Sequence, residues 1–361
     1  MKGGTCPLTE QWEIYVAEKK RRGHKKTLYD HSASERENII ADCGGRSFVS
    51  NQVNNWVFRK LVYEYEKMTN LSKPLRGELD SHFPIVTGHI EKTLTSADDT
   101  RKALVRYPDG TGVECVSIPS DKRVTFCIST MAGCPGRCLF CASGKHGFIR
   151  NLSRGEMLSQ YLLLSESIND YPANTVLMGS GEPLLNFDET RGFLFILNDQ
   201  KLADLGARRI TVSTIGIPEG IIRLAEEELQ FEIAFSLHHP DEKQRRKLIP
   251  LSRKYPLAAV IEALLVYRRK TNRVPTFEYC LLEGINDTLQ CAHKTARLAK
   301  RVRAKVNLIP YNTFCDDFRP PDRDTVFTFR GILEQEGVTA TIRRQRGADI
   351  DAACGQLAGR R

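Results

Sequence analysis

The 361-residue sequence lacks the features that mark membrane, secreted and repetitive proteins. No apolar run approaches the roughly 20 residues that a helix needs to cross a bilayer. The N-terminal stretch MKGGTCPLTEQWEIYVAEKKRRGHKK contains no uninterrupted apolar segment of the kind that a secretory signal requires. Low-complexity segments and internal repeats are not evident either. We therefore expect a cytoplasmic globular protein with one main domain and a smaller appendage.

Acidic residues are in deficit, because 44 Asp and Glu stand against 53 Lys and Arg, for a net charge of +9. The basic surplus lies in clusters at residues 19–22 with Lys25 and Lys26, and at residues 243–247, 268–270 and 343–346. A polyanionic partner is the natural functional interpretation of this pattern. Each run on its own is more typical of a solvated helix face. Charge therefore permits RNA binding without establishing it.

The 11 cysteines are an odd number in a chain without an export signal, which argues against a disulfide framework. Metal binding or catalysis is the better interpretation of any clustered subset. We expect the isolated cysteines to be small buried or incidental residues. Examples are Cys6, Cys43, Cys280 and Cys291.

The first hundred residues have helical patterns. Ser34-x-x-Glu37 has the form of a capping box, in which two side chains satisfy free amides at a helix start. An apolar stripe at helical spacing follows, made of Val53, Trp56, Val57, Leu61, Tyr65 and Met68. We expect this stripe to form core or to dock against the main domain, with no cofactor in it.

From about Lys102 the period changes to that of strands. LVRY and VECVSI flank Pro108-Asp109-Gly110, a turn-forming tripeptide that predicts a β-hairpin. Amphipathic segments, two of them starting at Ser153-x-x-Glu156 and at Pro256, then alternate with seven β-rich runs. The runs are VTFCIS, NTVLMGS, RITVST, EIAFSLH, FEYCLL, KVNLIP and TATIR. This alternation predicts an α/β protein with a parallel sheet, and the number of units favours a partial (β/α) TIM-type barrel over an open doubly wound sheet.

In such barrels the active site forms at the C-terminal ends of the strands. That rule selects the loops that begin after Ser129, Met178, Ser213, Ser236 and Pro310. The predicted domains are a helical N-terminal accessory domain over residues 1–100 with a β-hairpin linker to residue 122, a barrel over residues 123–345, and a tail over residues 346–361 that carries one cysteine.

The strongest signal is Cys134-x-x-x-Cys138-x-x-Cys141, in the loop after the first barrel strand. A structural zinc site usually has four protein ligands. A 4Fe-4S cluster that is held by only three cysteines leaves one iron open for a cofactor. S-adenosylmethionine (SAM) can chelate that iron and then be reductively cleaved to a radical. Zinc with His146 or His238 as a remote fourth ligand is the alternative.

The motif Cys134-x-x-x-Cys138-x-Phe140-Cys141 resembles the radical SAM signature. The longer stretch FCISTMAGCPGRCLFCASGKHGFIRNL resembles the RlmN/Cfr family of RNA adenosine methyltransferases. MGSGEPLLNFD, ITVSTIGI, FSLHHP, VNLIPYN and the tail RGADIDAACGQLAG match this family as well, so the resemblance runs from about residue 50 to residue 359. It implies a radical SAM fold with a small helical N-terminal domain that helps to bind folded RNA. The substrate it implies is an adenosine in 23S ribosomal RNA, with transfer RNA as a second possible substrate.

The resemblance also implies roles for individual residues. Cys134, Cys138 and Cys141 would hold one 4Fe-4S cluster, and SAM would be bound by Gly181, Glu182, Ser213, Ser236, Leu237, His238 and Asn312. Cys354 would take a methyl group from one SAM, and a second SAM would supply the radical that activates this methyl group. Cys127 would release the RNA by forming a transient disulfide with Cys354, and Glu114 would act as the base that removes the ring proton. Each of these residues, taken alone, is more typical of a structural role.

Some positions depart from the family pattern or leave alternatives open. The segment Ser129-Thr130-Met131-Ala132-Gly133 lacks a common glutamine, and Ser180 replaces a usual methionine, which puts substrate placement in doubt. GFIRNL and EPLLN favour methylation at carbon 2 of adenine, whereas STIGI and TIRRQ favour carbon 8; carbon 2 is the expectation. A flavodoxin-like reductant is implied, and neither DNA nor a membrane is an expected partner. The competing hypotheses are a radical SAM enzyme with a non-RNA substrate and a non-catalytic metal-containing RNA-binding protein.

Overall fold

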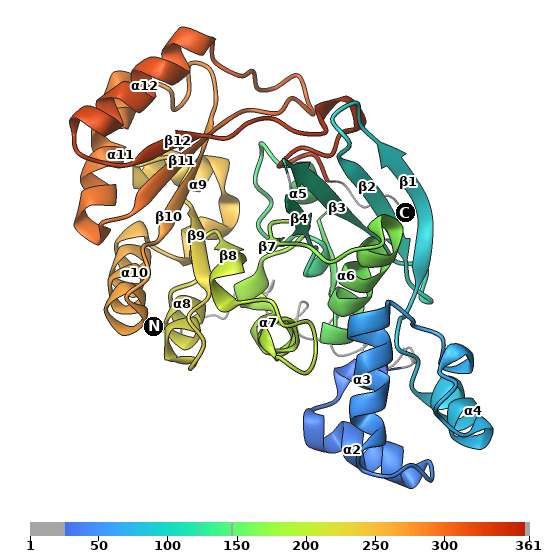
Figure 1. Cartoon of the computed structure of the whole chain (residues 1–361). Coiled ribbons are helices and arrows are strands. Elements are labelled where there is room, and N and C mark those ends of the chain that lie inside the picture. Colours follow the sequence, from blue (N-terminus) through green and yellow to red (C-terminus); the bar gives the residue numbers. More distant parts are fainter. Residues whose placement is uncertain (1–25, 122, 146, 358–361) are drawn as a thin grey trace, which may run out of the picture.

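The protein is built on one ten-stranded sheet that curves into an open arc, with most helices on its outer side (Figure 1). The structure is a computed structural model and describes residues 26–121, 123–145 and 147–357. The strand order is β1-β2-β3-β4-β7-β8-β9-β10-β11-β12. The strands are β1 (His89–Thr95), β2 (Arg101–Arg106), β3 (Gly112–Ser120), β4 (Arg123–Cys127), β7 (Asn174–Leu177), β8 (Ile210–Thr214), β9 (Glu232–Ser236), β10 (Thr276–Leu281), β11 (Lys305–Pro310) and β12 (Ala340–Ile342).

The half of the sheet from β4 to β12 is parallel, and a helical crossover connects each strand to the next. The crossover helices are α6 (Arg154–Ile168), α7 (Phe187–Asn198), α8 (Pro218–Glu226), α10 (Leu257–Thr271), α11 (Leu289–Val302) and α12 (Arg323–Gln335). Among the described strands, the outer strands β1 and β12 do not pair with each other, so the barrel stays open. The predicted partial barrel is confirmed, and the seven predicted β-rich runs overlap with β4 and β7–β12.

The other half of the sheet is antiparallel. The predicted hairpin around Pro108-Asp109-Gly110 is confirmed as β2 and β3, and it continues the barrel sheet through the pairing of β3 with β4. The prediction of helix up to residue 100 was wrong from His89, because β1 pairs along its whole length with β2. Most of β1 is exposed, so an apolar alternation that would have predicted this edge strand is missing from the sequence.

The N-terminal helices are α2 (Ala33–Asp42), α3 (Val49–Lys60) and α4 (Lys73–His82). The predicted capping box was wrong by two residues, because the N-cap of α2 is Ser32. Its backbone N–H donates to the Glu35 carboxylate at 2.6 Å, and its hydroxyl accepts from the Glu35 backbone N–H at 3.3 Å. The sequence HSASERE offers two serines that each lie three residues before a glutamate, and the pattern alone does not separate them.

The predicted apolar stripe is divided between two elements. Helix α3 ends at Lys60, and Leu61 follows in a left-handed conformation with φ 55°. Four of the six stripe residues are buried, while Trp56 and Leu61 are half-buried. The helices dock on the barrel through polar contacts to its backbone, such as Arg59 Nη1 to the Leu202 carbonyl oxygen at 2.7 Å. Because most of its residues are buried, the stripe is part of the core, as expected.

Two further helix starts were predicted. Ser153 caps α6 in the expected capping box, with the Ser153 backbone N–H donating to Glu156 Oε2 at 2.9 Å. Pro256 is the N-cap of α10, one residue before the first-turn position that was predicted. None of the helices in the described part of the chain is long and apolar enough to cross a membrane.

Candidate functional site

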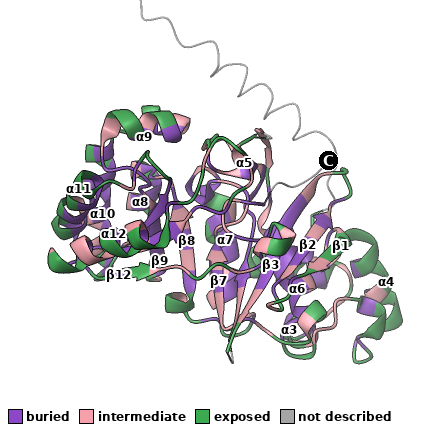
Figure 2. Ribbon diagram, turned by 90° about the horizontal axis from the view of Figure 1, so that it is seen from above, coloured by how far each residue is buried: buried purple, intermediate pink, exposed green. Residues whose placement is uncertain are grey.

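A pocket lies at the C-terminal ends of the parallel strands and contains about 870 Å³ of empty space, part of it open to solvent. Residues that follow or end β7, β8, β9 and β11 line it, including Met178, Ser213, Ser236 and Ile309. These are the loops that the barrel rule selected from the sequence. Helices α5 (Ala142–Lys145) and α9 (Glu242–Leu248) lie at this edge of the sheet (Figure 2).

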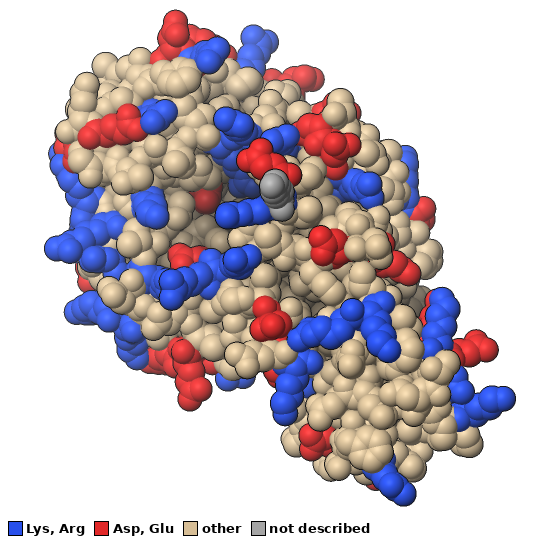
Figure 3. All heavy atoms as spheres, in the orientation of Figure 1, with Lys and Arg blue, Asp and Glu red and all other residues tan. Residues whose placement is uncertain are grey.

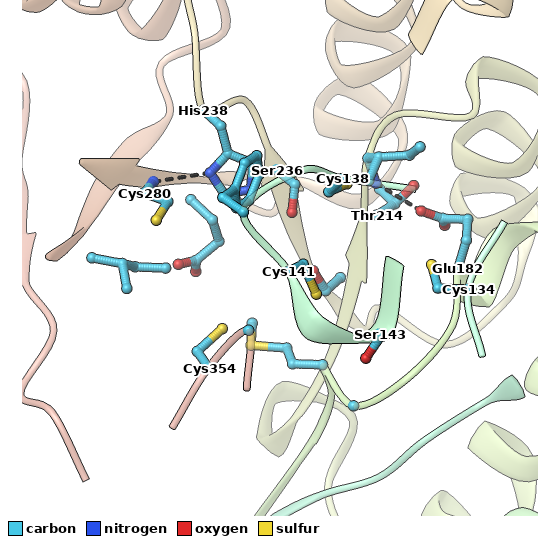
Figure 4. A pocket seen from close by; sticks show the side chains of 18 of the residues that line it. Cys134, Cys138, Cys141, Ser143, Glu182, Thr214, Ser236, His238, Cys280 and Cys354 are labelled. Atoms are coloured by element: carbon cyan, nitrogen blue, oxygen red, sulfur yellow. Dashed lines mark hydrogen bonds between the residues drawn. The ribbon is translucent and has the colours of Figure 1, made fainter. Parts of the chain in front are cut away.

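The three clustered cysteines line the same pocket (Figure 4). Their loop is bracketed by β5 (Met131–Gly133) and β6 (Phe148–Asn151), which pair in a small two-stranded sheet. The Leu139 backbone N–H donates to the Leu248 carbonyl oxygen at 3.0 Å and fixes the loop against the end of α9. Strands of three and four residues give too weak a pattern to be predicted, so this bracket was missed.

The chemistry of these donors fits an iron–sulfur cluster. Three soft sulfur atoms face one cavity, and Cys138 and Cys141 pack against the buried apolar residues Phe140, Leu248 and Leu282. Burial raises the pKa of all three thiols, that of Cys134 to about 12, so only a bound metal group would hold them as thiolates.

A single-ion site has less support. No three His, Cys, Asp or Glu side chains of the described residues gather closely enough to bind one metal ion. The zinc alternative needed His238 or His146 as a fourth ligand. The Nδ1 atom of His238 instead accepts a hydrogen bond from the Cys280 backbone N–H at 2.9 Å, and burial lowers the pKa of His238 to about 3. His146 lies outside the described residues.

Glu182 is a buried carboxylate on the pocket wall. Its Oε2 accepts from the Ile215 backbone N–H at 2.7 Å, and its Oε1 accepts from the Leu184 backbone N–H at 3.1 Å. Burial raises its pKa to about 7, and the two amide donors oppose that shift. The carboxylate lacks a cationic partner among the described residues, so it is suited to a cationic ligand such as the ammonium group of SAM.

Gly181, the residue before Glu182, has φ 120°, and a Cβ built there would lie 2.6 Å from Thr130 Oγ1. The turn that presents Glu182 therefore requires glycine. Ser180, where the family usually has methionine, is buried with its backbone N–H bonded to Ser129 Oγ, and it does not line the pocket.

The other predicted SAM residues divide into two groups. Ser213, Ser236 and His238 line the pocket together with Gly181 and Glu182. Leu237 is fully buried behind the wall, and Asn312 is also buried outside the lining. The Asn312 amide donates to the Cys354 carbonyl oxygen at 2.9 Å, so this residue supports the tail.

The C-terminal tail folds back across the barrel and places Cys354 in the pocket (Figure 4). The Ala142 backbone N–H donates to the Gly355 carbonyl oxygen at 2.7 Å, and the Ser143 hydroxyl donates to the Leu357 carbonyl oxygen at 2.6 Å. The tail is thus bonded to the helix that directly follows Cys141. The structure therefore brings Cys354 to the three clustered cysteines, which lie more than two hundred residues earlier in the chain.

Cys127 and Glu114, the other two predicted catalytic residues, do not line the pocket. Cys127 ends β4 and packs in an apolar cluster with Ala352 and Leu357 of the tail. Burial raises the pKa of its thiol to about 12, and negative charge on Cys354 contributes to that rise. Glu114 forms an ion pair with Lys102 at 3.2 Å. Both residues therefore lie near the tail, and neither is part of the cavity wall.

Three chemically active side chains in the pocket were not predicted. Glu278 and Cys280 project from β10, and Arg343 follows β12. Glu278 left a signal in the sequence, because it is a charged residue in the apolar run FEYCLL. Arg343 was counted in one of the basic clusters, and Cys280 was expected to be a small buried or incidental residue.

The basic clusters need a second correction at Arg245. It is buried in α9, and its guanidinium donates to the carbonyl oxygens of Leu237, Ser236 and Ile215, so it holds two pocket loops together. Residues 19–22 and Lys25 lie outside the described residues. Other Lys and Arg side chains gather around a hollow in the middle of one face (Figure 3). The surface remains suited to a polyanion, although Arg245 and Arg343 do not belong to it.

Comparisons with known proteins agree with this geometry. Residues 128–298 match the family model of the radical SAM superfamily. Residues 26–85, which contain the three N-terminal helices, match the model described as ribosomal RNA large subunit methyltransferase N-terminal domain.

Similar proteins cover almost the whole chain. The probable dual-specificity RNA methyltransferase RlmN of Thermotoga petrophila is 42% identical over 333 residues, which is 92% of this chain and 97% of the relative. The protein of the same description from Clostridium perfringens is 38% identical over 92% of this chain and 96% of its own. The crystal structure of a radical SAM methyltransferase from Sphaerobacter thermophilus matches with a TM-score of 0.90 at 38% identity, over 93% of this chain and 100% of that chain.

Proposed function

This chain belongs to the RlmN family of radical SAM RNA methyltransferases, and from that premise we propose that it methylates carbon 2 of an adenine through a methyl group carried on Cys354. One observation carries the proposal. Cys354 lies in the same pocket as Cys134, Cys138 and Cys141, although it comes from the far end of the chain. A thiol that served only the packing of the tail would not need to face the cofactor cavity.

The enzyme uses a 4Fe-4S cluster and SAM, as radical SAM proteins do. We assign the cluster to Cys134, Cys138 and Cys141. Glu182 accepts the ammonium group of SAM, and the wall residues Gly181, Ser213, Ser236 and His238 surround the molecule. Leu237 and Asn312 act from behind the wall. When bound, the cluster and SAM supply the methyl group and the hydrogen-abstracting radical chemistry.

Cys354, Glu114 and Cys127 act one after another in the proposed reaction. The sulfur of Cys354 accepts it from one SAM, and a second SAM is consumed to activate it, so that two are used per turnover. The activated carbon then bonds to the adenine ring, Glu114 removes the ring proton, and the unpaired electron that remains passes to the cluster. Cys127 attacks the sulfur of Cys354; the Cys127–Cys354 disulfide forms, the bond from Cys354 to the transferred carbon breaks, and that carbon takes the electron pair and a proton.

We propose that the tail moves during these steps. Cys127 and Glu114 lie outside the pocket wall, whereas Cys354 lies inside it. Lys102 connects the two positions, because its Nζ forms the ion pair with Glu114 and donates to the Asp351 carbonyl oxygen at 2.9 Å. A displacement of residues around Asp351 would therefore carry Cys354 toward the base and the resolving thiol.

The proposed substrates are 23S ribosomal RNA and transfer RNA. The relatives are described as dual-specificity RNA methyltransferases, and the matched N-terminal model belongs to large-subunit ribosomal RNA methyltransferases. The target adenine must leave its stack to reach Cys354, so an adenine in a loop is the suitable substrate. The barrel (residues 123–345), the N-terminal helices and the tail act as the three functional parts, in the cytoplasm, with a flavodoxin-like protein as electron donor.

The test is an anaerobic assay with the reconstituted enzyme, SAM, a chemical reductant and unmodified ribosomal or transfer RNA. The digested RNA is examined by mass spectrometry against 2-methyladenosine and 8-methyladenosine standards. We expect 2-methyladenosine from the natural enzyme and from Cys43→Ala, a control far from the pocket, and none from Cys354→Ala. SAM cleavage without a methylated adenosine on either RNA would overturn the RNA substrates. The appearance of 8-methyladenosine would overturn the target carbon alone.

A further inference from the structure

Arg343 lines the pocket without a role in the reaction described above. It directly follows β12, where its backbone N–H donates to the Leu308 carbonyl oxygen at 2.8 Å. Its Nη1 donates to the sulfur of Met178 at 3.6 Å, so the guanidinium reaches across to the end of β7. Of the described residues that line the pocket, Arg343 is the only Lys or Arg.

Three groups that can carry negative charge lie close enough to this guanidinium to interact with it electrostatically, and two of them, Cys354 and Glu278, line the same pocket. Cys354, Glu278 and Cys127 each raise the pKa of Arg343. In return, Arg343 lowers the pKa of the Cys354 and Cys127 thiols against the opposing effect of burial. Arg343 therefore lies within electrostatic reach of both sulfur atoms that the proposed reaction uses.

Hydrogen bonds made by β12, the strand that Arg343 follows, hold this part of the chain in place. Glu278 Oε2 accepts a hydrogen bond from Asn307 Nδ2 at 2.8 Å, and Asn307 Oδ1 accepts one from the Thr341 hydroxyl at 2.9 Å. Thr341 lies in β12, two residues before Arg343. The hydrogen bonds from Glu278 through Asn307 to Thr341 tie β12 to the neighbouring parallel strands, and Arg343 extends into the pocket from the end of that strand.

We propose that Arg343 is the cation that stabilises negative charge on the sulfur of Cys354 while this sulfur takes the methyl group of SAM. The inference rests on the proposed function and deepens it. In the step, the thiol proton passes to solvent, the S–C bond to Cys354 forms, and the bond from the methyl group to the sulfonium breaks with its electron pair going to the departing sulfur. The thiolate is the nucleophilic form, and burial alone opposes it.

The experiment follows methylation of Cys354 in the cluster-loaded enzyme with SAM, without reductant and without RNA. Peptide mass spectrometry gives the unmodified fraction of Cys354 at the start and its conversion to S-methylcysteine. We expect Arg343→Gln to slow this conversion about 10- to 100-fold, as loss of a charge facing a thiolate predicts. Arg343→Lys keeps the charge and should recover most of the rate. Arg297→Gln removes an exposed charge from α11 and should leave the rate unchanged.

A second measurement distinguishes an effect of the charge of Arg343 on Cys354 from an effect of its packing. Cys354 is alkylated with the anionic reagent iodoacetate and with the neutral reagent iodoacetamide, and the ratio of the two rates is compared among variants. Arg343→Gln should lower the ratio, because the anionic reagent loses its attraction, and Arg343→Lys should preserve it. Glu278→Gln, which removes the facing anion, should raise it and keeps the test available even where Arg343→Gln does not fold.

The outcomes distinguish this inference from the proposed function. Equal methylation rates and equal reagent ratios in Arg343→Gln and the natural enzyme would overturn the role of Arg343. Absence of S-methylcysteine at Cys354 in the natural enzyme would instead overturn the proposed carrier mechanism. Cluster absorbance and SAM binding verify that each variant is folded before either comparison is made.

Discussion

Glu182 allows a quantitative prediction about the protein without its cofactors. Burial raises the pKa of this carboxyl from 4.5 to about 7. The difference of about 2.5 pH units corresponds to about 3.4 kcal/mol, at 1.36 kcal/mol per unit. Between pH 4.5 and about 7 the folded protein holds the proton on Glu182 more tightly than the unfolded chain does. The free energy of unfolding must therefore fall as the pH rises through this window, by up to about 3 kcal/mol.

The substitution Glu182→Gln removes this proton linkage. The amide keeps one acceptor for the backbone N–H groups of Leu184 and Ile215, so the variant should be less stable than the natural protein near pH 4.5. Because only the natural protein loses stability through Glu182 as the pH rises, this difference should shrink or reverse by pH 7. The assay is anaerobic urea denaturation of the cluster-free protein at several pH values, followed by circular dichroism. Glu219→Gln, at an exposed position in α8, is the control and should keep the slope of the natural protein. Parallel curves for the natural protein and Glu182→Gln across this window would refute the reasoning.

Three further predictions concern the turn, a helix cap and the tail. Gly181→Ala forces an L-residue to φ 120° against Thr130 Oγ1, and should cost about 2 kcal/mol or more and weaken SAM binding, as measured by denaturation and by calorimetry. Ser153→Ala removes the N-cap of α6 and should lower the free energy of unfolding by about 1 kcal/mol, whereas an unchanged denaturation midpoint would contradict the capping role. Ser143→Ala removes the 2.6 Å hydrogen bond from the Ser143 hydroxyl to the Leu357 carbonyl oxygen of the tail and should speed amide hydrogen exchange in residues 347–357, with exchange in the N-terminal helices as the internal control.

Much of the barrel could be predicted from sequence because its strands are short β-rich runs between amphipathic segments. Burial on both faces selects such runs, and the cysteine motif marks the first loop of the barrel. The edge strand β1 and the pair β5 and β6 lack this signal, since β1 is mostly exposed and the pair is only three and four residues long. The pattern of apolar residues in the sequence indicates which strands are buried, whereas these exposed or very short strands form through pairing with a neighbouring strand.

The site was predicted in part for a similar reason. Motifs identified the residues at strand ends, and most of the predicted cluster and SAM residues do line one pocket. A motif does not report which side of a wall a side chain occupies, so Leu237 and Asn312 could not be separated from Ser213 and His238. Arg245 and Arg343 belong to runs of basic residues that are typical of a surface, and only the tertiary structure reveals them as buried or pocket-facing.

The central claim is that the methyl group reaches RNA through Cys354, and isotope labelling tests it most directly. The enzyme is loaded with SAM that carries a trideuterated methyl group, without reductant, and is then freed of excess SAM. The reaction is started with unlabelled SAM, reductant and RNA, and the product of the first turnover is examined by mass spectrometry. We predict a 2-methyladenosine that carries two deuterium atoms, because one is abstracted and a proton from solvent or a thiol replaces it. An unlabelled methyl group in that first product, with the trideuterated group still on Cys354, would contradict the account.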